Sequence, residues 1–254
     1  MSHPPPGPDR LLSGPHNSRL GPAIHAFNLP AEPDVCVGAT PTCSAICYAK
    51  GFLFRIQLAR HRRNHERSRD DRFARAMSGE IRRGRVRVVR VHVSGDFDDV
   101  GYARRWAAVA RACPGAAFFA YTRSWRSAEV LAELIALARL PNVFLWFSED
   151  RDTGRSPAVP RVRRAYLLSD GEAVDEVPAD SDLVFRAPRP RRPGRPNEYD
   201  RPAKRANGVL ICPKEQGIAR RVDLTCSSCR ICFTEPARRV ETPRPESPST
   251  VAPV

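Results

Sequence analysis

The chain has 254 residues and carries 42 Lys or Arg against 28 Asp or Glu, which gives a net charge of +14 at pH 7. No apolar run approaches the roughly 20 residues of a membrane helix, and the start of the chain lacks the apolar core of a signal peptide. These features exclude a membrane-spanning protein and predict a soluble, cytoplasmic one. Thiols stay reduced in that compartment, so clustered cysteines indicate metal binding before they indicate disulfides.

The positive charge raises the question of a nucleic-acid partner, because Lys and Arg neutralise phosphates. Arginines are spread along the whole chain, and one segment, Arg186 to Arg205, is dense in both Arg and Pro. The segment has no helical periodicity. It is typical of a solvated surface loop, and it is also compatible with an arm that binds a phosphate backbone or an acidic partner. Both interpretations stay open.

Composition divides the chain into five parts. The ends are rich in Pro, Ser and Arg and poor in periodic apolar residues, which predicts disordered tails. The predicted parts are a tail at 1–22, an α/β domain at 23–185, a basic Pro/Arg-rich loop at 186–206, a cysteine-rich metal-binding segment at 207–235 and a second tail at 236–254.

Strands and helices alternate along the predicted domain. Val89, Val91 and Val93 alternate with polar residues as in a strand, whereas residues such as Met77 and Ile81 recur at helical spacing. In chain order, strands are expected at 23–29, 86–94, 116–121, 143–148, 165–169 and 183–185, and helices at 70–83, from 98 or 99, and at 127–139. Repeated βαβ units imply a parallel sheet with helical crossovers. The predicted fold is therefore α/β, a TIM-like or partial (β/α) barrel with a C-terminal cysteine-rich segment.

Polar residues stand where three predicted strands end. The three groups are Ser94-Gly95-Asp96, Tyr121-Thr122-Arg123-Ser124 and Ser148-Glu149-Asp150. Ligands bind at the carboxyl ends of parallel strands, so Asp96, Arg123 and Glu149 become candidate catalytic residues on one shared edge. The alternative is that such residues only form turns and helix caps.

Seven of the eight cysteines form two groups. Cys36, Cys43 and Cys47 have the spacing C-x6-C-x3-C, directly after the first predicted strand. Cys212, Cys226, Cys229 and Cys232 have the spacing C-x13-C-x2-C-x2-C. Consecutive short loops let thiolates reach several irons of one [4Fe–4S] cluster, and a three-cysteine set leaves one iron open to a small molecule.

Other assignments of these cysteines remain open. Zinc, which favours two separated C-x2-C pairs, is an alternative at the C-terminal group. The early and late cysteines can also belong to one structural site, or either group can consist of ordinary buried cysteines. Cys113, alone at a predicted helix end, is expected to be structural.

Six segments together resemble the phage and plasmid gene product 88 family. They are FNLP (27–30), CVGATPTCSAICYAKG (36–51), VRVHVSGDF (89–97), FFAYTRS (118–124), CPKEQG (212–217) and CSSCRICF (226–233). The resemblance covers roughly residues 25–233, and the order of the motifs makes it specific. It implies relatives among mobile genetic elements but no particular reaction.

A looser likeness is to radical S-adenosylmethionine enzymes, which carry a three-cysteine loop after the first barrel strand and a Gly-Gly-Glu-type motif after the second. Ser94, Gly95 and Asp96 correspond to that motif and would bind the cofactor, with Asp96 accepting a hydrogen bond from its amino group. The likeness also implies an auxiliary cluster at the C-terminal cysteines. The early cysteine spacing differs from the usual C-x3-C-x2-C, and the second motif here has one glycine and Asp in place of Glu.

Taken together, the sequence predicts an iron–sulfur protein with one or two [4Fe–4S] clusters. It favours a radical S-adenosylmethionine-like enzyme that takes electrons from a donor. The alternative from another class is a non-catalytic, metal-stabilised (Fe–S or Zn) nucleic-acid-binding protein of mobile genetic elements. Neither the substrate nor the oligomeric state follows from these residues.

Overall fold

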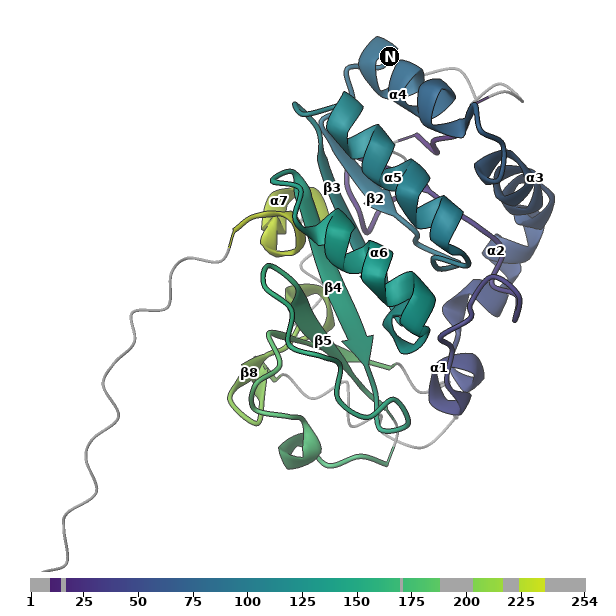
Figure 1. Cartoon of the computed structure of the whole chain (residues 1–254). Helices are drawn as coiled ribbons and strands as arrows, with labels where there is room; N and C mark the ends of the chain where they lie inside the picture. The colour runs from purple at the N-terminus through teal and green to yellow at the C-terminus, as the bar shows by residue number, and fades with distance from the viewer. Residues whose placement is uncertain (1–9, 15–16, 170, 188–202, 217–223, 236–254) are drawn as a thin grey trace, which may run out of the picture.

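The computed structural model describes residues 10–14, 17–169, 171–187, 203–216 and 224–235 (Figure 1). Six strands form one sheet in which neighbouring strands run parallel. They are β1 (Ile24–Phe27), β2 (Val88–Val91), β3 (Ala117–Thr122), β4 (Val143–Glu149), β5 (Arg163–Leu168) and β6 (Leu183–Arg186). A small antiparallel hairpin, β7 (Arg205–Ala206) and β8 (Val209–Leu210), follows the sheet.

The helices fall mainly between β1 and β4. The α-helices are α1 (Pro41–Ala45), α2 (Phe52–Ile56), α3 (Leu58–Ser68), α4 (Phe73–Arg83), α5 (Val100–Ala112), α6 (Ala128–Ala138) and α7 (Cys226–Cys229). The 3-10 helices are η1 (Tyr48–Lys50), η2 (Ser124–Arg126), η3 (Val174–Glu176), η5 (Pro213–Glu215) and η6 (Ile231–Phe233).

The strand order in the sheet, β1 to β6, is the same as the order along the chain. Every crossover therefore moves in one direction, and right-handed crossovers then place their helices on one face of the sheet. Figure 1 shows α4, α5 and α6 side by side over that face. The sheet is a curled half-barrel, and the predicted parallel α/β fold with a partial barrel is confirmed.

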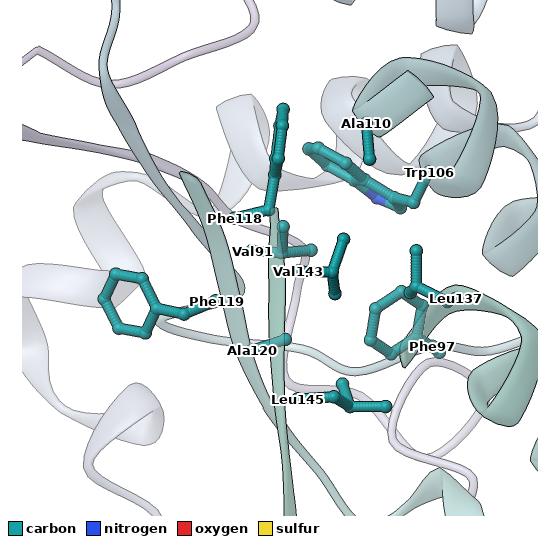
Figure 2. A pocket seen from close by; sticks show the side chains of 10 residues that line it. All are labelled: Val91, Phe97, Trp106, Ala110, Phe118, Phe119, Ala120, Leu137, Val143 and Leu145. Atoms are coloured by element: carbon teal, nitrogen blue, oxygen red, sulfur yellow. The ribbon is translucent and has the colours of Figure 1, made fainter. Parts of the chain in front are cut away.

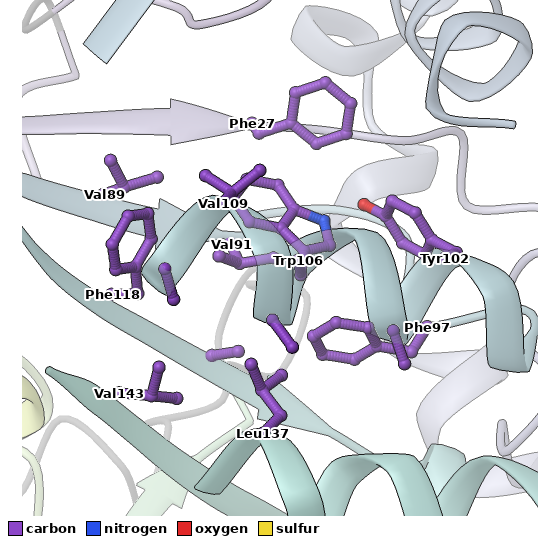
Figure 3. Close-up of a cluster of buried hydrophobic side chains, with 14 of the residues drawn as sticks. Phe27, Val89, Val91, Phe97, Tyr102, Trp106, Val109, Phe118, Leu137 and Val143 are labelled. Atoms are coloured by element: carbon purple, nitrogen blue, oxygen red, sulfur yellow. The ribbon is translucent and has the colours of Figure 1, made fainter. Parts of the chain in front are cut away.

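The main core lies between the sheet and these helices (Figure 3). Tyr102, Trp106 and Val109 recur along one side of α5 and are almost fully buried against the sheet. The alternate residues of the strands, such as Val91 and Phe118, meet them. Figure 2 shows a small cavity in this layer, lined by apolar side chains alone. The lining side chains are aliphatic or aromatic, and the space is a packing gap of the core.

The opposite, concave face of the sheet is covered by the C-terminal cysteine-rich segment and not by helices from the crossovers. Phe119 is adjacent to Phe118 in β3 and points to this other side, as Figure 2 shows. Phe233 in η6 packs on it, with ring centroids 5.3 Å apart. Trp146 of β4 is likewise buried on the concave side, in a cluster with Cys212. Both faces of β3 and β4 are covered, which explains why these strands are apolar almost throughout.

Three details differ from the sequence-based expectation. The second strand ends at Val91 and not at residue 94, because His92 takes the left-handed conformation with φ 68°. The reversal turns Val93 to the concave face, opposite Val91. The stretches that form α1, α2 and α3 had no predicted element.

Part of the predicted N-terminal tail is packed. Leu11, Leu12 and Leu20 are buried, and Ser13 forms a bridge with Ala26 of the first strand. The packed part of the chain therefore begins before residue 23. The other domain boundaries stay predictions, since the C-terminal tail at 236–254 lies outside the described residues. No helix among the described residues is long and apolar enough to cross a membrane.

Candidate cysteine sites at the edge and on the concave face of the sheet

The first cysteine group lies in the loop that follows β1. Thr40 is the N-cap of α1, and its hydroxyl accepts a hydrogen bond from the backbone N–H of Cys43 at 2.9 Å. Pro41 occupies the first position of this helix, where a missing N–H costs nothing. Cys36 precedes the helix and Cys47 follows it, so one short capped turn holds the three cysteines near one another.

The thiols of this group interact electrostatically. Burial raises the pKa of the Cys36 thiol, and Asp96 raises it further. Cys43 and Cys47 act on the pKa of Cys36 in the same direction, while the guanidinium of Arg123 opposes them. Burial also raises the pKa of Cys43, and Arg123 again lowers it. The three thiols and two of the predicted catalytic residues therefore share one environment.

A hydrogen-bond network joins the carboxyl ends of three strands to the cysteine loop. Asp96 follows β2, and its carboxylate accepts from the backbone N–H of Arg123 at 2.8 Å. The Arg123 guanidinium pairs with Asp150, which follows β4, at 3.0 Å. Asp150 in turn accepts from the hydroxyl of Thr40 at 2.8 Å. The loop is thus fixed to the edge of the sheet through charged, buried groups.

Asp96 is almost fully buried. Burial raises the pKa of its carboxyl, while hydrogen bonds from Thr122 and from the backbone N–H groups of Arg123 and Phe97 lower it. These are three donors for about four acceptor sites on a carboxylate.

Gly38 makes the closest approach between the loop and the sheet. A Cβ at this position would lie 2.0 Å from the carbonyl oxygen of Arg123. Every other residue type would push the loop away from β3, so only glycine allows the observed contact. The Nη1 of Arg126 closes the same contact by donating to the Gly38 carbonyl at 3.1 Å.

Glu149, the third predicted catalytic residue, lies elsewhere. It is fully buried on the helix side of β4, where its carboxylate accepts from the backbone and hydroxyl of Ser156 at 2.8 and 2.6 Å. It also pairs with Arg155 and, at 3.7 Å, with Arg164. Among the strand-end residues of β4, the structure places Asp150 beside Arg123, not Glu149. A catalytic role of Glu149 stays a prediction.

Ser94 and Gly95, predicted to bind a cofactor, pack against the end of β1. The hydroxyl of Ser94 donates to the carbonyl of Leu29 at 2.7 Å. Gly95 has φ 80°, and a Cβ there would lie 2.5 Å from the Cβ of Leu29. Both residues therefore shape the edge next to Asp96.

The second cysteine group gathers on the concave face. Residues after β8 run beside β6, where the backbone N–H of Cys212 donates to the carbonyl of Val184 at 2.8 Å. Cys226 and Cys229 belong to α7, and Cys232 belongs to η6. Chain segments that are far apart in sequence thereby meet over the middle of the sheet.

These four thiols also interact with one another. Burial raises the pKa of Cys212 to about 12, and Cys232 contributes to the rise. Burial raises the pKa of Cys226 and of Cys232, and Cys229 acts on both in the same direction. The guanidinium of Arg90 lowers the pKa of Cys226 and Cys232. A cation thus lies beside this group, as Arg123 lies beside the first.

Cys232 is the point at which the segment is held to the sheet. Its carbonyl accepts from Trp146 Nε1 at 3.0 Å and from Arg163 at 3.2 Å. The Arg163 guanidinium stacks on the Trp146 ring, 3.9 Å from the centroid. The hydroxyl of Tyr121 donates to the Cys232 thiol at 2.8 Å.

The N-terminal segment holds the other end of α7. The backbone N–H groups of Cys226 and Ser227 donate to the carbonyls of Arg19 and Leu20, both at 2.9 Å. Gly21 has φ 86°, and a Cβ there would lie 2.2 Å from the hydroxyl of Ser227. The cysteine-rich segment is therefore packed from both sides.

The chemistry of both donor sets fits a thiophilic metal centre. Three or four thiols that interact, with a cation beside them, suit iron–sulfur clusters or zinc. Among the described residues, no group of three or more His, Cys, Asp or Glu side chains already has the arrangement of a metal site. The thiols would have to turn toward a common centre on binding. Cys113, by contrast, is buried in the helix-side core, as expected of a structural cysteine.

Several residues of these sites were not singled out from the sequence for the contacts they make. They are Thr40, Arg90, Tyr121, Asp150 and Arg163. Thr40 carried a local signal, since Thr-Pro is a frequent helix start. The others act across strands, and only the register of the sheet brings them to the cysteines. The basic residues 188–202 lie outside the described part of the chain.

A family model, gene product 88, matches residues 9–235. The chain belongs to the gene product 88 family. It is similar to the Gene 88 protein of Mycobacterium phage L5, with 31% identity over 131 residues, which are 46% of this chain and 53% of that protein. The chain thus aligns with about half the length of this curated relative. No solved structure was found to match. The resemblance noted in the sequence is confirmed at the level of the family.

Proposed function

We propose that this gene product 88 family member is an iron–sulfur protein with two [4Fe–4S] centres. Cys36, Cys43 and Cys47 would hold one at the edge of the sheet, and the four C-terminal cysteines would hold the other on the concave face. The support for the proposal is the spacing of the seven cysteines in the sequence, together with the electrostatic interactions between thiols within each group on a parallel half-barrel. Metal binding would replace the protons that burial otherwise keeps on these thiols.

We further propose that the three-cysteine centre binds S-adenosylmethionine, as in the enzymes that the early loop resembles. Such a centre, when bound, has one iron free for the amino and carboxylate groups of the cofactor and can deliver an electron to its sulfonium. Support comes from the position of the loop after β1 and of Asp96 after β2 in a sheet with sequential strand order.

The chain's own residues have separable tasks in this proposal. Asp96 would accept a hydrogen bond from the cofactor's amino group. The Arg123 guanidinium, held by Asp150, supplies a fixed positive charge beside the thiols and can bind a carboxylate. Thr40 holds the start of α1 and thereby the position of Cys43.

Metal analysis after anaerobic purification and reconstitution tests the first proposal. The full chain should hold about eight irons and eight sulfides when both centres fill. Replacing Cys36, Cys43 and Cys47 with Ala should remove about half of the iron, and so should the matched triple replacement of Cys226, Cys229 and Cys232. Cys113→Ala is the control and should keep all of it. A colourless protein that holds only zinc would contradict the proposal, and zinc at the C-terminal group alone would limit it to one centre.

Equilibrium dialysis with S-adenosylmethionine tests the second proposal. Wild-type protein should bind one equivalent, and Asp96→Asn should bind it at least about tenfold more weakly with unchanged iron content, because an amide is a poorer acceptor than a carboxylate. Loss of iron in Asp96→Asn would make this residue structural. Absence of binding to the iron-loaded wild type would leave an iron–sulfur protein without this cofactor.

A further inference from the structure

Large apolar side chains are exposed around the three-cysteine loop. Among the described residues, six such side chains are exposed, and five of them lie between residues 37 and 56. They are Val37, Tyr48, Phe52, Leu53 and Ile56. The most exposed are Phe52 at 74% and Leu53 at 72%. Contiguous apolar patches on a surface mark sites of interaction. We call these five residues the loop patch.

The loop patch adjoins the cysteines of the predicted centre along the chain. Val37 follows Cys36 and Tyr48 follows Cys47 in the chain. The Tyr48 hydroxyl donates to the carbonyl of Val93, at the carboxyl edge of the sheet. Its ring meets the edge of Phe54 at 5.6 Å between centroids. These contacts hold the aromatic ring beside the cysteines while much of it stays exposed.

The chain that carries the loop patch is rich in positive charge. From residue 35 to residue 65 the chain contains no Asp or Glu and five basic residues, which are Lys50, Arg55, Arg60, Arg62 and Arg63. Arg62 pairs with Glu32 at 2.6 Å, and Arg60 donates to the carbonyl of Leu12. Lys50, Arg55 and Arg63 are exposed around α2 and α3.

An apolar centre with an Arg-rich rim matches a protein interface more closely than a nucleic-acid interface. Protein interfaces have an apolar core enriched in aromatic residues and Arg. Nucleic-acid interfaces are polar, and aliphatic side chains such as Leu53 and Ile56 gain little there. A mainly basic rim favours an acidic partner, because like charges repel and complementary charges speed the encounter.

From this geometry we infer that the loop patch is the docking surface of an acidic electron-carrier protein that reduces the three-cysteine centre. The inference rests on the proposed iron–sulfur function and names its partner. The carrier gives one electron to the oxidised centre, which becomes reduced by one electron, and a flavin hydroquinone in the carrier becomes the semiquinone. No bond to the loop patch forms or breaks.

Reduced flavodoxin, a small acidic flavoprotein, serves as the probe. Its reduction of the iron-loaded full chain is followed by stopped-flow absorbance, with dithionite as a small chemical reductant that needs no docking surface. The Phe52→Ser/Leu53→Ser variant should lose at least about tenfold in the second-order rate with flavodoxin. Its rate with dithionite should stay that of the wild type. Val174→Ser, a change of an exposed apolar residue on η3, is the matched control and should leave both rates unchanged.

Charge is tested separately. The wild-type rate with flavodoxin should fall as salt rises, and Arg55→Ser/Arg63→Ser should flatten this dependence, whereas the exposed Arg111→Ser should not. The inference is overturned if flavodoxin reduces the wild type and the loop-patch variant at equal rates. It is also overturned if dithionite reduces the wild-type centre and flavodoxin does not.

Failure of the proposed function has a different signature. If dithionite reduces nothing, the iron–sulfur proposal fails, and calorimetric titration with oxidised flavodoxin still decides whether the loop patch binds an acidic protein. Single-stranded DNA and anionic vesicles are the competing occupants. The inference is overturned if the wild type binds DNA or vesicles but not flavodoxin, and if the loop-patch variant loses that binding. The surface then belongs to the class of ligand that binds.

Discussion

Replacement of Glu149 separates a structural role from a catalytic one. The carboxylate is fully buried and accepts two hydrogen bonds from Ser156, in addition to its ion pairs with Arg155 and Arg164. We expect Glu149→Ala to unfold more easily, because the Ser156 donors and part of two arginines lose their partner inside the protein.

The size of the effect follows from these contacts. A hydrogen bond to a charged group contributes about 1.5–3 kcal/mol, and removing one partner of a buried ion pair costs about 3–5 kcal/mol. The Arg155 side chain is 38% exposed and regains water, which lowers the total. We therefore expect a loss of about 3–5 kcal/mol in the free energy of unfolding, or about 10 °C in Tm for a domain of this size.

The assay is urea unfolding followed by circular dichroism, with linear extrapolation to water. Glu149→Gln keeps the shape and one acceptor oxygen and should lie between wild type and Glu149→Ala. Asp180→Asn is the matched control, since Asp180 pairs with the same two arginines but its side chain is 60% exposed. It should cost less than about 1 kcal/mol. A Glu149→Ala protein as stable as the wild type would refute the structural assignment.

Three further predictions address the loop, the C-terminal centre and pH. Gly38→Ala places a Cβ 2.0 Å from the Arg123 carbonyl oxygen, so we expect the cysteine loop to shift. Anaerobic reconstitution of this variant should then yield about half of the wild-type iron. Full iron content would show that the loop tolerates the shift. Tyr121→Phe removes the hydrogen bond to the Cys232 thiol and should lower the reduction potential of the C-terminal centre, with metal content unchanged. The potential is measured in a titration monitored by electron paramagnetic resonance. An unchanged potential would show that this hydrogen bond does not tune the centre. Burial lowers the pKa of His92 to about 3, so the unfolded chain binds a proton at this residue before the folded chain does as pH falls. The free energy of unfolding should therefore decrease below pH 6.5, with a contribution from His92 of about 2 kcal/mol at pH 5. His92→Asn should reduce this slope in urea unfolding at several pH values, and an unchanged slope would show that His92 is not its source.

The sequence by itself determined the fold class and the grouping of the cysteines. Alternation in Val89 and Val91 and the four-residue spacing of Met77 and Ile81 are local signals, because each depends only on which side of a strand or helix faces the core. Short cysteine spacings are likewise local. The family also follows from motifs that lie in the chain itself.

The tertiary structure alone decided which groups face the cysteines. Glu149 and Asp150 are neighbours in sequence, yet one turns to the helix side and the other to the loop, and the direction depends on where β4 ends. Tyr121 and Arg163 reach Cys232 only because β3, β4 and β5 pair in one register and the C-terminal segment crosses their concave face. Such contacts join residues more than 60 positions apart, and no local preference of the chain specifies them.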